Sequence, residues 1–327
     1  MQIVLNIVLL LVGFVLLIKG ADFFVDGAAS LARKLKIPSL VVGLTIVAIG
    51  TSSPELAVSI SASLSGANSM AVSNVVGSNI FNLLVVIGIC ALIAPVGVTK
   101  DILKRDFPVS IGVMAVFVAM LFIGSVTGGL DLIEAIILVV LLVGYMVWTV
   151  CAALKERKNA AEEEEQKPFV WWKCALFIVG GVAAIIFGGD LVVDNASALG
   201  AAIGMSETLI GLTICAVGTS LPELVTSIAA SKRGETDMAM GNVVGSNIFN
   251  VVCILGISGV ISPITINAAA LTNTLVDCFV YIGVAILTYI FCLTSKKVTR
   301  VEGGILAGLY IVYMAYAILR DVVFVAA

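Results

Sequence analysis

Two glutamates occupy matching positions in the two halves of this 327-residue chain, each inside a long apolar stretch. Glu55 belongs to the run Gly50-Thr51-Ser52-Ser53-Pro54-Glu55-Leu56, and Glu223 to Gly218-Thr219-Ser220-Leu221-Pro222-Glu223-Leu224. A carboxylate within an apolar span costs free energy unless something neutralises it, so such residues mark functional sites. Lys19 is the only basic candidate partner, and its counterpart in the second half is Phe187. We therefore expect an external cation to neutralise both glutamates.

A proline next to each glutamate predicts a break in the helix. Pro54 has no N–H and its ring clashes with the carbonyl group of residue 50, so the helix should open around Gly50 and Thr51. The same argument applies to Pro222, which frees carbonyl oxygens at Gly218 and Thr219. Irregular backbone at membrane depth is tolerated where it lines a cavity or binds an ion. Backbone oxygens should therefore join the carboxylates.

Further oxygen groups recur every four residues in the next apolar segment of each half, which places them on one helix face. These are Asn74, Ser78 and Asn82 in the first half, and Asn242, Ser246 and Asn250 in the second. Asn74 and Asn242 could equally link helices through hydrogen bonds. The chain has no histidine, and hard cations prefer such all-oxygen sites. Two carboxylates balance the charge of one Ca²⁺ or two Na⁺, and a flexible cage suits Ca²⁺ better than Mg²⁺.

The composition places these motifs in a membrane protein. Of the residues, 61% are apolar and only 12% are charged, about half the charged fraction of a soluble domain. Nothing indicates nucleic-acid binding or an organic cofactor, and the missing histidine removes the Ser-His-Asp triad. Apolar segments long enough to span a bilayer lie at about 3–30, 38–65, 70–95, 107–125, 130–153, 172–199, 206–231, 237–262, 271–294 and 302–325.

The chain is an internal duplication. Residues 43–95 align without a gap on 211–263 at an offset of 168, with 31 identities in 53 positions. A duplicated unit of five spans must insert in opposite senses, which is an inverted repeat. The prediction is an all-α integral membrane protein with ten transmembrane helices as two inverted five-helix repeats. The repeats cover residues 1–153 and 172–327, with motif helices at about 38–95 and 206–262, joined by a linker at 154–171.

The basic residues predict how the chain is oriented. Sixteen of the 18 Lys and Arg residues fall in the odd-numbered loops between the expected spans, and none falls in the even-numbered loops. By the positive-inside rule, both termini face outward and the central linker is cytoplasmic. We expect a multi-pass protein of the cell membrane that acts as a monomer.

With its paired G-T-S-x-P-E-L and G-S-N-I-F-N motifs, the sequence closely resembles the calcium/cation antiporter superfamily, specifically the compact prokaryotic calcium/sodium antiporters. The resemblance covers essentially the whole chain. It implies that Glu55 and Glu223 are shared ligands of Ca²⁺ and Na⁺, and that the carbonyl groups of Thr51 and Thr219 complete the calcium site. It further implies sodium sites and a central position built by the remaining residues, namely Ser52, Ser78, Ser220 and Ser246, the carbonyl groups of Ala48 and Ala216, and Asn82 and Asn250.

One position departs from the wider family. Relatives that co-transport K⁺ carry Asp at the position of Asn250, so its absence favours transport that does not depend on K⁺. The expected function is secondary active exchange of Na⁺ for Ca²⁺ by alternating access, not enzymatic catalysis. Another divalent ion such as Mn²⁺ would fit the same oxygen ligands.

Three other functions are open to the same residues. In a proton-coupled calcium exchanger, the glutamates would bind H⁺, although protons need no flanking serine and carbonyl cage. A passive cation channel and an intramembrane protease with paired acids are the other two. Asp22 and Asp26, with their copies Asp190 and Asp194, could cap or solvate helix ends, or could take part in ion passage or gating.

Overall fold

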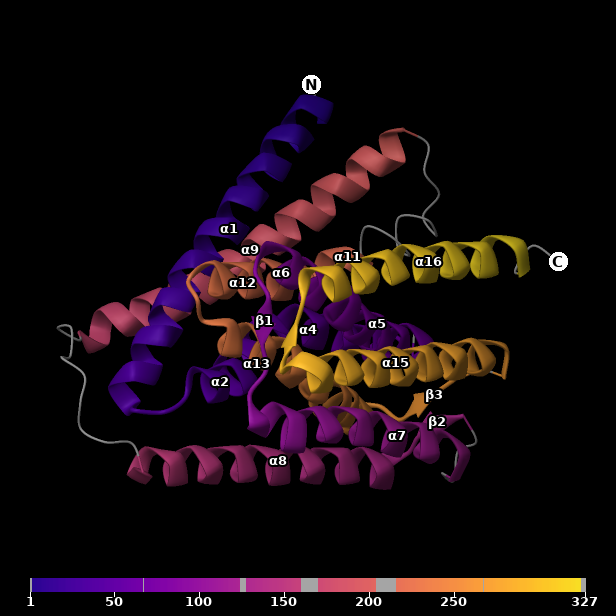
Figure 1. Cartoon of the computed structure of the whole chain (residues 1–327). Helices are drawn as coiled ribbons and strands as arrows, with labels where there is room; N and C mark the ends of the chain where they lie inside the picture. The colour runs from indigo at the N-terminus through magenta and orange to yellow at the C-terminus, as the bar shows by residue number, and fades with distance from the viewer. Residues whose placement is uncertain are drawn as a thin grey trace.

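The computed structural model describes residues 2–66, 68–123, 128–159, 170–203, 216–266 and 268–324, and helices dominate it (Figure 1). By length and composition, eight of its helices could cross a membrane, and the bent pair Ser39–Thr51 and Ser53–Leu64 makes a ninth span if counted as one. The protein is thus a multi-pass helical membrane protein. The expected span at 206–231 lies partly outside the described residues, and ten spans stay a prediction.

The first half contains two long unbroken helices and three spans assembled from shorter helical pieces. In chain order its elements are α1 (Gln2–Leu35), α2 (Ser39–Val42), the π-helix η1 (Gly43–Val47), α3 (Ala48–Thr51), α4 (Ser53–Leu64), α5 (Asn68–Phe81), η2 (Asn82–Val86), α6 (Ile87–Ile93), β1 (Val96–Gly97), η3 (Ile102–Asp106), α7 (Phe107–Ile123), β2 (Gly129–Leu130) and α8 (Leu132–Asn159).

The second half repeats this order. Its elements are α9 (Trp171–Ala202), α11 (Ala216–Thr219), α12 (Leu221–Lys232), α13 (Thr236–Phe249), η5 (Asn250–Leu255), α14 (Gly256–Ile261), β3 (Ile264–Thr265), α15 (Ala268–Ser295), β4 (Lys297–Val298) and α16 (Arg300–Phe324).

α1 and α8 extend furthest beyond their predicted ends. α1 continues to Leu35 rather than stopping at residue 30, and α8 continues to Asn159 rather than 153. The added residues of α8 include Leu154, Lys155 and Arg157, which are good helix formers, so the helix continues after its apolar part ends. The predicted linker at 154–171 therefore begins as helix, and its residues 160–169 lie outside the described part.

Two short strand pairs lie at opposite ends of the helix stack (Figure 1). β1 pairs with β4 in antiparallel register, Val96 opposite Val298, and β2 pairs with β3, Leu130 opposite Ile264. Adding 168 to Val96 gives Ile264, and subtracting it from Val298 gives Leu130. Each strand pair thus joins the two halves of the chain, and one pair maps onto the other by the offset of the sequence repeat.

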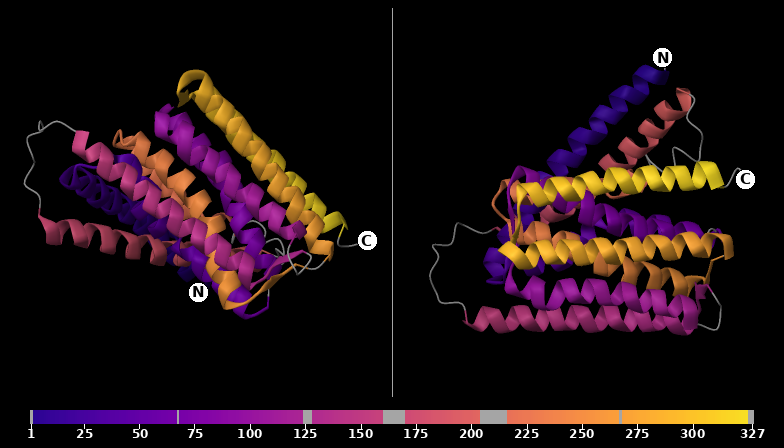
Figure 2. Two further views of the ribbon diagram at one scale, coloured as in Figure 1. Left: turned by 90° about the horizontal axis from the view of Figure 1, so that it is seen from below. Right: turned by 45° about the vertical axis from the view of Figure 1, so that its right-hand side comes forward.

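α1 and α9 form a separate helix pair, set at an angle to α7, α8, α15 and α16 (Figures 1 and 2). A Cβ added at Gly188 would lie 2.8 Å from the carbonyl oxygen of Gly13, and one at Gly181 would lie 2.9 Å from that of Gly20. As the contacting residues advance along α1, their partners go backward along α9, so the two helices are antiparallel. Glycine is required here because the backbones touch.

The motif-bearing spans occupy the centre. Most residues of Met70–Ile93 and Thr236–Ile261 are buried, whereas α1, α8 and α16 are largely exposed and carry apolar side chains outward. α13 also packs closely on the second span. A Cβ at Gly241 would lie 2.7 Å from the Leu40 carbonyl oxygen, and one at Gly245 would lie 2.9 Å from that of Leu44. Small residues thus allow the central helices to meet backbone to backbone.

Candidate cation-binding site

The break in each motif helix is centred on a serine. α3 ends at Thr51 and α4 begins at Ser53, with Ser52 between them at φ −83° and ψ 8° and a bend of 47°. Ser220 takes nearly the same conformation, φ −94° and ψ 5°, before α12. The break therefore lies one to two residues after the predicted position at Gly50 and Thr51. The reason is that Pro54 sits in the first turn of α4, where a helix needs no N–H group.

The breaks bring the two glutamates into one buried site. The side chains of Glu55 and Glu223 are both fully buried. Ser52 Oγ donates to Glu223 Oε1 at 2.8 Å, and Ser220 Oγ donates to Glu55 Oε1 at 3.1 Å. Ser246 Oγ adds a longer bond of 3.4 Å to Glu223 Oε1. Each carboxylate is therefore held by a serine from the other half of the chain.

Among the described residues, neither glutamate has a basic partner. Lys19 lies 4.0 Å from Asp22 and is mostly exposed, so it does not neutralise either carboxylate. The Oε2 atoms of both Glu55 and Glu223 are buried and have no hydrogen-bond partner. An unpaired buried carboxylate is costly, which is the condition that a bound cation would relieve.

Other buried oxygens in the motifs are also without a hydrogen-bond partner. They are Ser78 Oγ, Asn82 Oδ1, Thr219 Oγ1 and Asn250 Oδ1. With the two free carboxylate oxygens, these atoms make up a set of carboxylate, hydroxyl and amide oxygens that are buried without a hydrogen-bond partner. Hard cations such as Na⁺ and Ca²⁺ prefer this set. In the described part of the chain, no three His, Cys, Asp or Glu residues cluster as a metal site, so a cation here would need the neutral oxygens as well.

Two asparagines that the sequence analysis left out of the site cross-link the halves. Asn79 Nδ2 donates to the Asn247 carbonyl oxygen at 3.1 Å, and Asn247 Nδ2 donates to the Asn79 carbonyl oxygen at 3.4 Å. Their side-chain oxygens accept from Asn250 Nδ2 and Asn82 Nδ2, each at 3.0 Å. The amide nitrogens of Asn82 and Asn250 are thereby fixed, which leaves their Oδ1 atoms available. Asn79 and Asn247 both belong to the G-S-N-I-F-N motifs, and their recurrence in both halves could have marked them as part of the site.

Asn74 and Asn242 link helices, as one of their two predicted roles requires. Asn74 Nδ2 donates to the Glu55 carbonyl oxygen at 3.4 Å and to Ser59 Oγ at 3.1 Å. Asn242 Nδ2 makes the equivalent bonds to the Glu223 carbonyl oxygen and Ser227 Oγ. These bonds hold the carboxylate-bearing helix of each half against its polar stripe.

The structure places ten of the twelve predicted ligands in the buried interior. They are Ala48, Thr51, Ser52, Glu55, Ser78, Asn82, Ser220, Glu223, Ser246 and Asn250. Thr219 is partly buried, and Ala216 begins α11. The Ala48 carbonyl oxygen accepts the Ser52 N–H at 3.0 Å, and Thr51 Oγ1 donates to Asn242 Oδ1 at 3.1 Å. As cation ligands, all twelve stay predictions.

Comparison with known proteins gives consistent results. The family model described as sodium/calcium exchanger protein matches residues 5–151 and 173–319. The putative antiporter CaxA of Alkalimonas amylolytica is 39% identical over 315 residues, 94% of this chain and 96% of that protein. The sodium/calcium exchanger MaX1 of Methanosarcina acetivorans is 33% identical over 358 residues, 96% of this chain and 98% of that protein.

A solved structure is similar over nearly the same length. The sodium-calcium exchanger NCX_Mj, from a crystal soaked with Na⁺ and Sr²⁺, superposes with a TM-score of 0.81 at 32% identity and covers 96% of this chain and 99% of that one. The match to the family model takes in both halves, each with its own glutamate motif. The chain therefore belongs to the sodium/calcium exchanger family, whose members are transporters and not enzymes.

Proposed function

We propose that this protein is a secondary active antiporter that exchanges Na⁺ for Ca²⁺ across the cell membrane by alternating access, independently of K⁺. The observation that carries the proposal is the pair of fully buried carboxylates, each held by a serine of the other half and each with an oxygen left without a partner. The relatives named as sodium/calcium exchangers support the choice of ions.

Mutual exclusion of the ions follows from charge. Two carboxylates balance one Ca²⁺ or two Na⁺, so both ions would use Glu55 and Glu223 and could not occupy the site together. Ser52, Ser78, Ser220 and Ser246 would flank these carboxylates as sodium ligands. The carbonyl groups of Ala48, Thr51, Ala216 and Thr219 and the amide oxygens of Asn82 and Asn250 would complete the coordination. Asn250 is neutral, so a third charge for K⁺ is missing.

The proposal includes ten spans in two inverted repeats, residues 1–153 and 172–327. The antiparallel contact of α1 with α9 supports it, because the first helix of an inverted copy must run the opposite way. The two strand pairs at opposite ends of the stack give the same support. The antiparallel pair α1 and α9 would slide against the remaining helices and expose the site to each face in turn.

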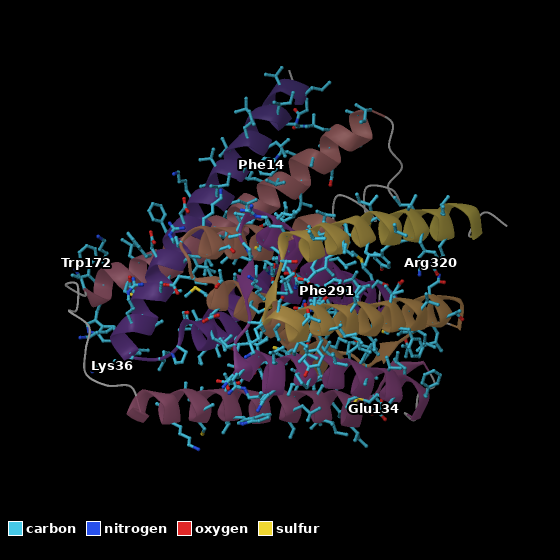
Figure 3. All side chains as sticks on the ribbon, viewed as in Figure 1. Phe14, Lys36, Glu134, Trp172, Phe291 and Arg320 are labelled. Carbon is cyan, nitrogen blue, oxygen red and sulfur yellow. The ribbon has the colours of Figure 1, made fainter. Side chains whose placement is uncertain are left out.

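We further propose that both termini face outward, that the linker at 154–171 is cytoplasmic and that the protein acts as a monomer. Lys36 and Trp172 lie at one end of the molecule, and Glu134 and Arg320 lie at the other (Figure 3). The first end would face the cytoplasm, where basic loop residues collect. The Trp172 ring lies beside that end, at the start of α9, as expected of a side chain at the membrane interface.

The direct test is uptake of radiolabelled Ca²⁺ into Na⁺-loaded proteoliposomes diluted into choline, K⁺ or Na⁺ buffer. Uptake should require internal Na⁺, should vanish in external Na⁺, and should be equal in choline and K⁺. Glu55→Gln and Glu223→Gln should each abolish it. Glu134→Gln is the matched control, because Glu134 accepts a bond from the Asp131 N–H at the start of α8 and takes no part in the site.

A parallel arm applies a pH gradient without Na⁺. Calcium uptake that follows this gradient and ignores Na⁺ would replace the proposal with proton-coupled calcium exchange. In that case the glutamates would remain the ion ligands, and the serines would serve packing only.

A further inference from the structure

An arginine at the end of α12 binds two aspartates of α1. Arg233 Nε donates to Asp26 Oδ1 at 2.8 Å and Arg233 Nη2 to Asp26 Oδ2 at 3.3 Å, a two-point contact. Arg233 Nη1 donates to Asp22 Oδ1 at 2.9 Å. A weaker pair, Arg33 with Glu235 at 3.5 Å, lies beside it. These bonds tie α1 to the end of the helix that carries Glu223.

The equivalent positions of the sequence repeat lack this cluster. The offset of 168 carries Asp22 and Asp26 onto Asp190 and Asp194, but it carries Arg233 back onto Ser65. The Ser65 hydroxyl donates only to carbonyl oxygens of its own helix, those of Ser61 and Ala62. Within the described ranges, Asp190 and Asp194 form no ion pair. The charge cluster therefore exists at one end of the protein.

Helix packing has the same asymmetry. α1 packs along α12, whereas α9, the counterpart of α1, makes no comparable contact with α4 in the described part of the chain. In an alternating-access protein built from two equivalent halves, the two contacts belong to opposite states, because closing one end opens the other. The structure thus has the Arg233 end closed.

We propose that Arg233 is a positioning residue that latches α1 onto α12 and biases the exchanger toward the state closed at that end, which the charge distribution assigns to the cytoplasm. The inference rests on the proposed alternating-access function. The Arg233, Asp22 and Asp26 side chains are 29%, 36% and 47% exposed, so water and salt weaken each pair. A weak latch is suited to a transporter, which must break it in every cycle.

The test measures how fast a cysteine near each end reacts with a membrane-impermeant maleimide in nanodiscs. Ser231→Cys reports the Arg233 end and Ser63→Cys the opposite end, because both serines are buried and correspond under the offset of 168. The exposed Cys151 is replaced by serine, and this parent chain gives the background. Arg233→Gln should raise labelling at position 231 by about 3- to 10-fold, as expected for losing two partly exposed ion pairs, and should not raise it at position 63, which controls for general loosening.

Two further variants control the result. Arg233→Lys should retain most of the closed state, because it keeps the charge. Ser65→Arg should supply the missing arginine opposite Asp190 and Asp194, and should shift labelling in the same direction as Arg233→Gln. Labelling at positions 231 and 63 that is unchanged in both Arg233→Gln and Ser65→Arg would overturn the latch.

Calcium-dependent thermal stabilisation, measured on the same samples, separates this inference from the proposed function. If the labelling shifts occur but neither Ca²⁺ nor Na⁺ stabilises any variant, the latch stands and the ion assignment fails. If Ca²⁺ stabilises every variant but labelling never changes, the exchanger assignment stands and the latch fails. Should Arg233→Gln unfold, the charge exchange Asp26→Arg with Arg233→Asp should restore the wild-type labelling rates, and failure to restore them in a folded protein counts against the latch.

Discussion

Ser52 Oγ lies 2.8 Å from Glu223 Oε1, although the two residues come from opposite halves of the chain. In the equivalent pair, Ser220 Oγ lies 3.1 Å from Glu55 Oε1. Neither half can therefore build the site alone. Each serine also stands at the break of its helix, so a change in the bend moves the hydroxyl relative to the other half's carboxylate. If an ion binds Glu55 and Glu223 as proposed, this relationship couples the shape of the helix breaks to the coordination of that ion.

Ser52→Ala should weaken Na⁺ and Ca²⁺ binding by about 10- to 100-fold, since a hydrogen bond to a charged group is worth about 1.5–3 kcal/mol. The substitution removes a predicted sodium ligand and leaves Glu223 Oε1 with only the long bond from Ser246. The measurement is the ion concentration that gives half-maximal exchange. Ser53→Ala is the matched control, because the Ser53 hydroxyl binds the Ile49 carbonyl oxygen of its own helix, and its affinity should equal that of the wild type.

Calcium should stabilise the folded protein, because it would neutralise two buried carboxylates that lack a basic partner in the described residues. At a concentration 100 times Kd, ligand binding adds about 2.7 kcal/mol. Thermal unfolding in detergent, with Ca²⁺ or with a chelator, measures this difference. In Glu55→Gln the difference should disappear, while the chelated protein should become more stable than the chelated wild type because one buried charge is gone. A calcium shift of wild-type size in Glu55→Gln would contradict the proposed ligand role.

Asn250→Asp should make calcium uptake sensitive to K⁺. The substitution adds a third carboxylate to the site, and its charge calls for a further monovalent cation. Uptake by the wild type should be the same in K⁺ and choline, whereas uptake by the variant should differ between the two buffers by at least about twofold, because an uncompensated charge inside a membrane costs about 2.5–3.5 kcal/mol. Asn74→Asp, on a residue that bridges Glu55 and Ser59, tests whether any added carboxylate has this effect. Equal K⁺ dependence in both variants would argue against a specific role for position 250.

Asn79→Ala should destabilise the protein more than it impairs any single ion contact. It removes the donor to the Asn247 carbonyl oxygen and the acceptor for Asn250 Nδ2, so two buried polar groups each lose a hydrogen bond. Each such group costs about 1–3 kcal/mol. Thermal unfolding measures the loss, and Asn247→Ala should show a similar one because its bonds are reciprocal. Markedly unequal losses of stability would mean that Asn79 and Asn247 do not contribute equally to the contact between the two halves.

The sequence alone predicted much of this architecture because the duplication repeats both the motifs and their spacing. The buried pair Glu55 and Glu223 could be identified because a carboxylate in an apolar span has few explanations. The position of the helix break was less accurate. Proline restricts several residues before it, and only the three-dimensional turn shows that Ser52, not Gly50, takes the non-helical conformation.

The hydrophobic periodicity of the sequence could not predict several other features. The π-helical segments η1, η2 and η5 were not predicted, because hydrophobic patterns follow the α-helical period and do not mark where a helix widens. The pairing of Arg233 with Asp22 and Asp26 joins residues more than 200 positions apart, and no local signal connects them. The sequence set Lys19 aside as a partner for the glutamates because its counterpart is Phe187, and in the structure Lys19 lies next to Asp22 on an exposed face.

Gly181→Val should stop transport without abolishing ion binding. A Cβ at Gly181 would meet the backbone nitrogen of Phe24 at 2.7 Å and the Gly20 carbonyl oxygen at 2.9 Å, so valine must push α9 away from α1. The proposed sliding pair would then lose its close contact, while the predicted ligands, none of which lies in α1 or α9, would be untouched. Calcium-dependent thermal stabilisation should survive and sodium-driven calcium uptake should fall by at least about tenfold, equivalent to roughly 1.4 kcal/mol.

Gly180→Val, one residue earlier and facing open space, should retain uptake. Loss of uptake in both variants would point to the general effect of valine in this helix, and full uptake in Gly181→Val would argue against α1 and α9 as the moving part.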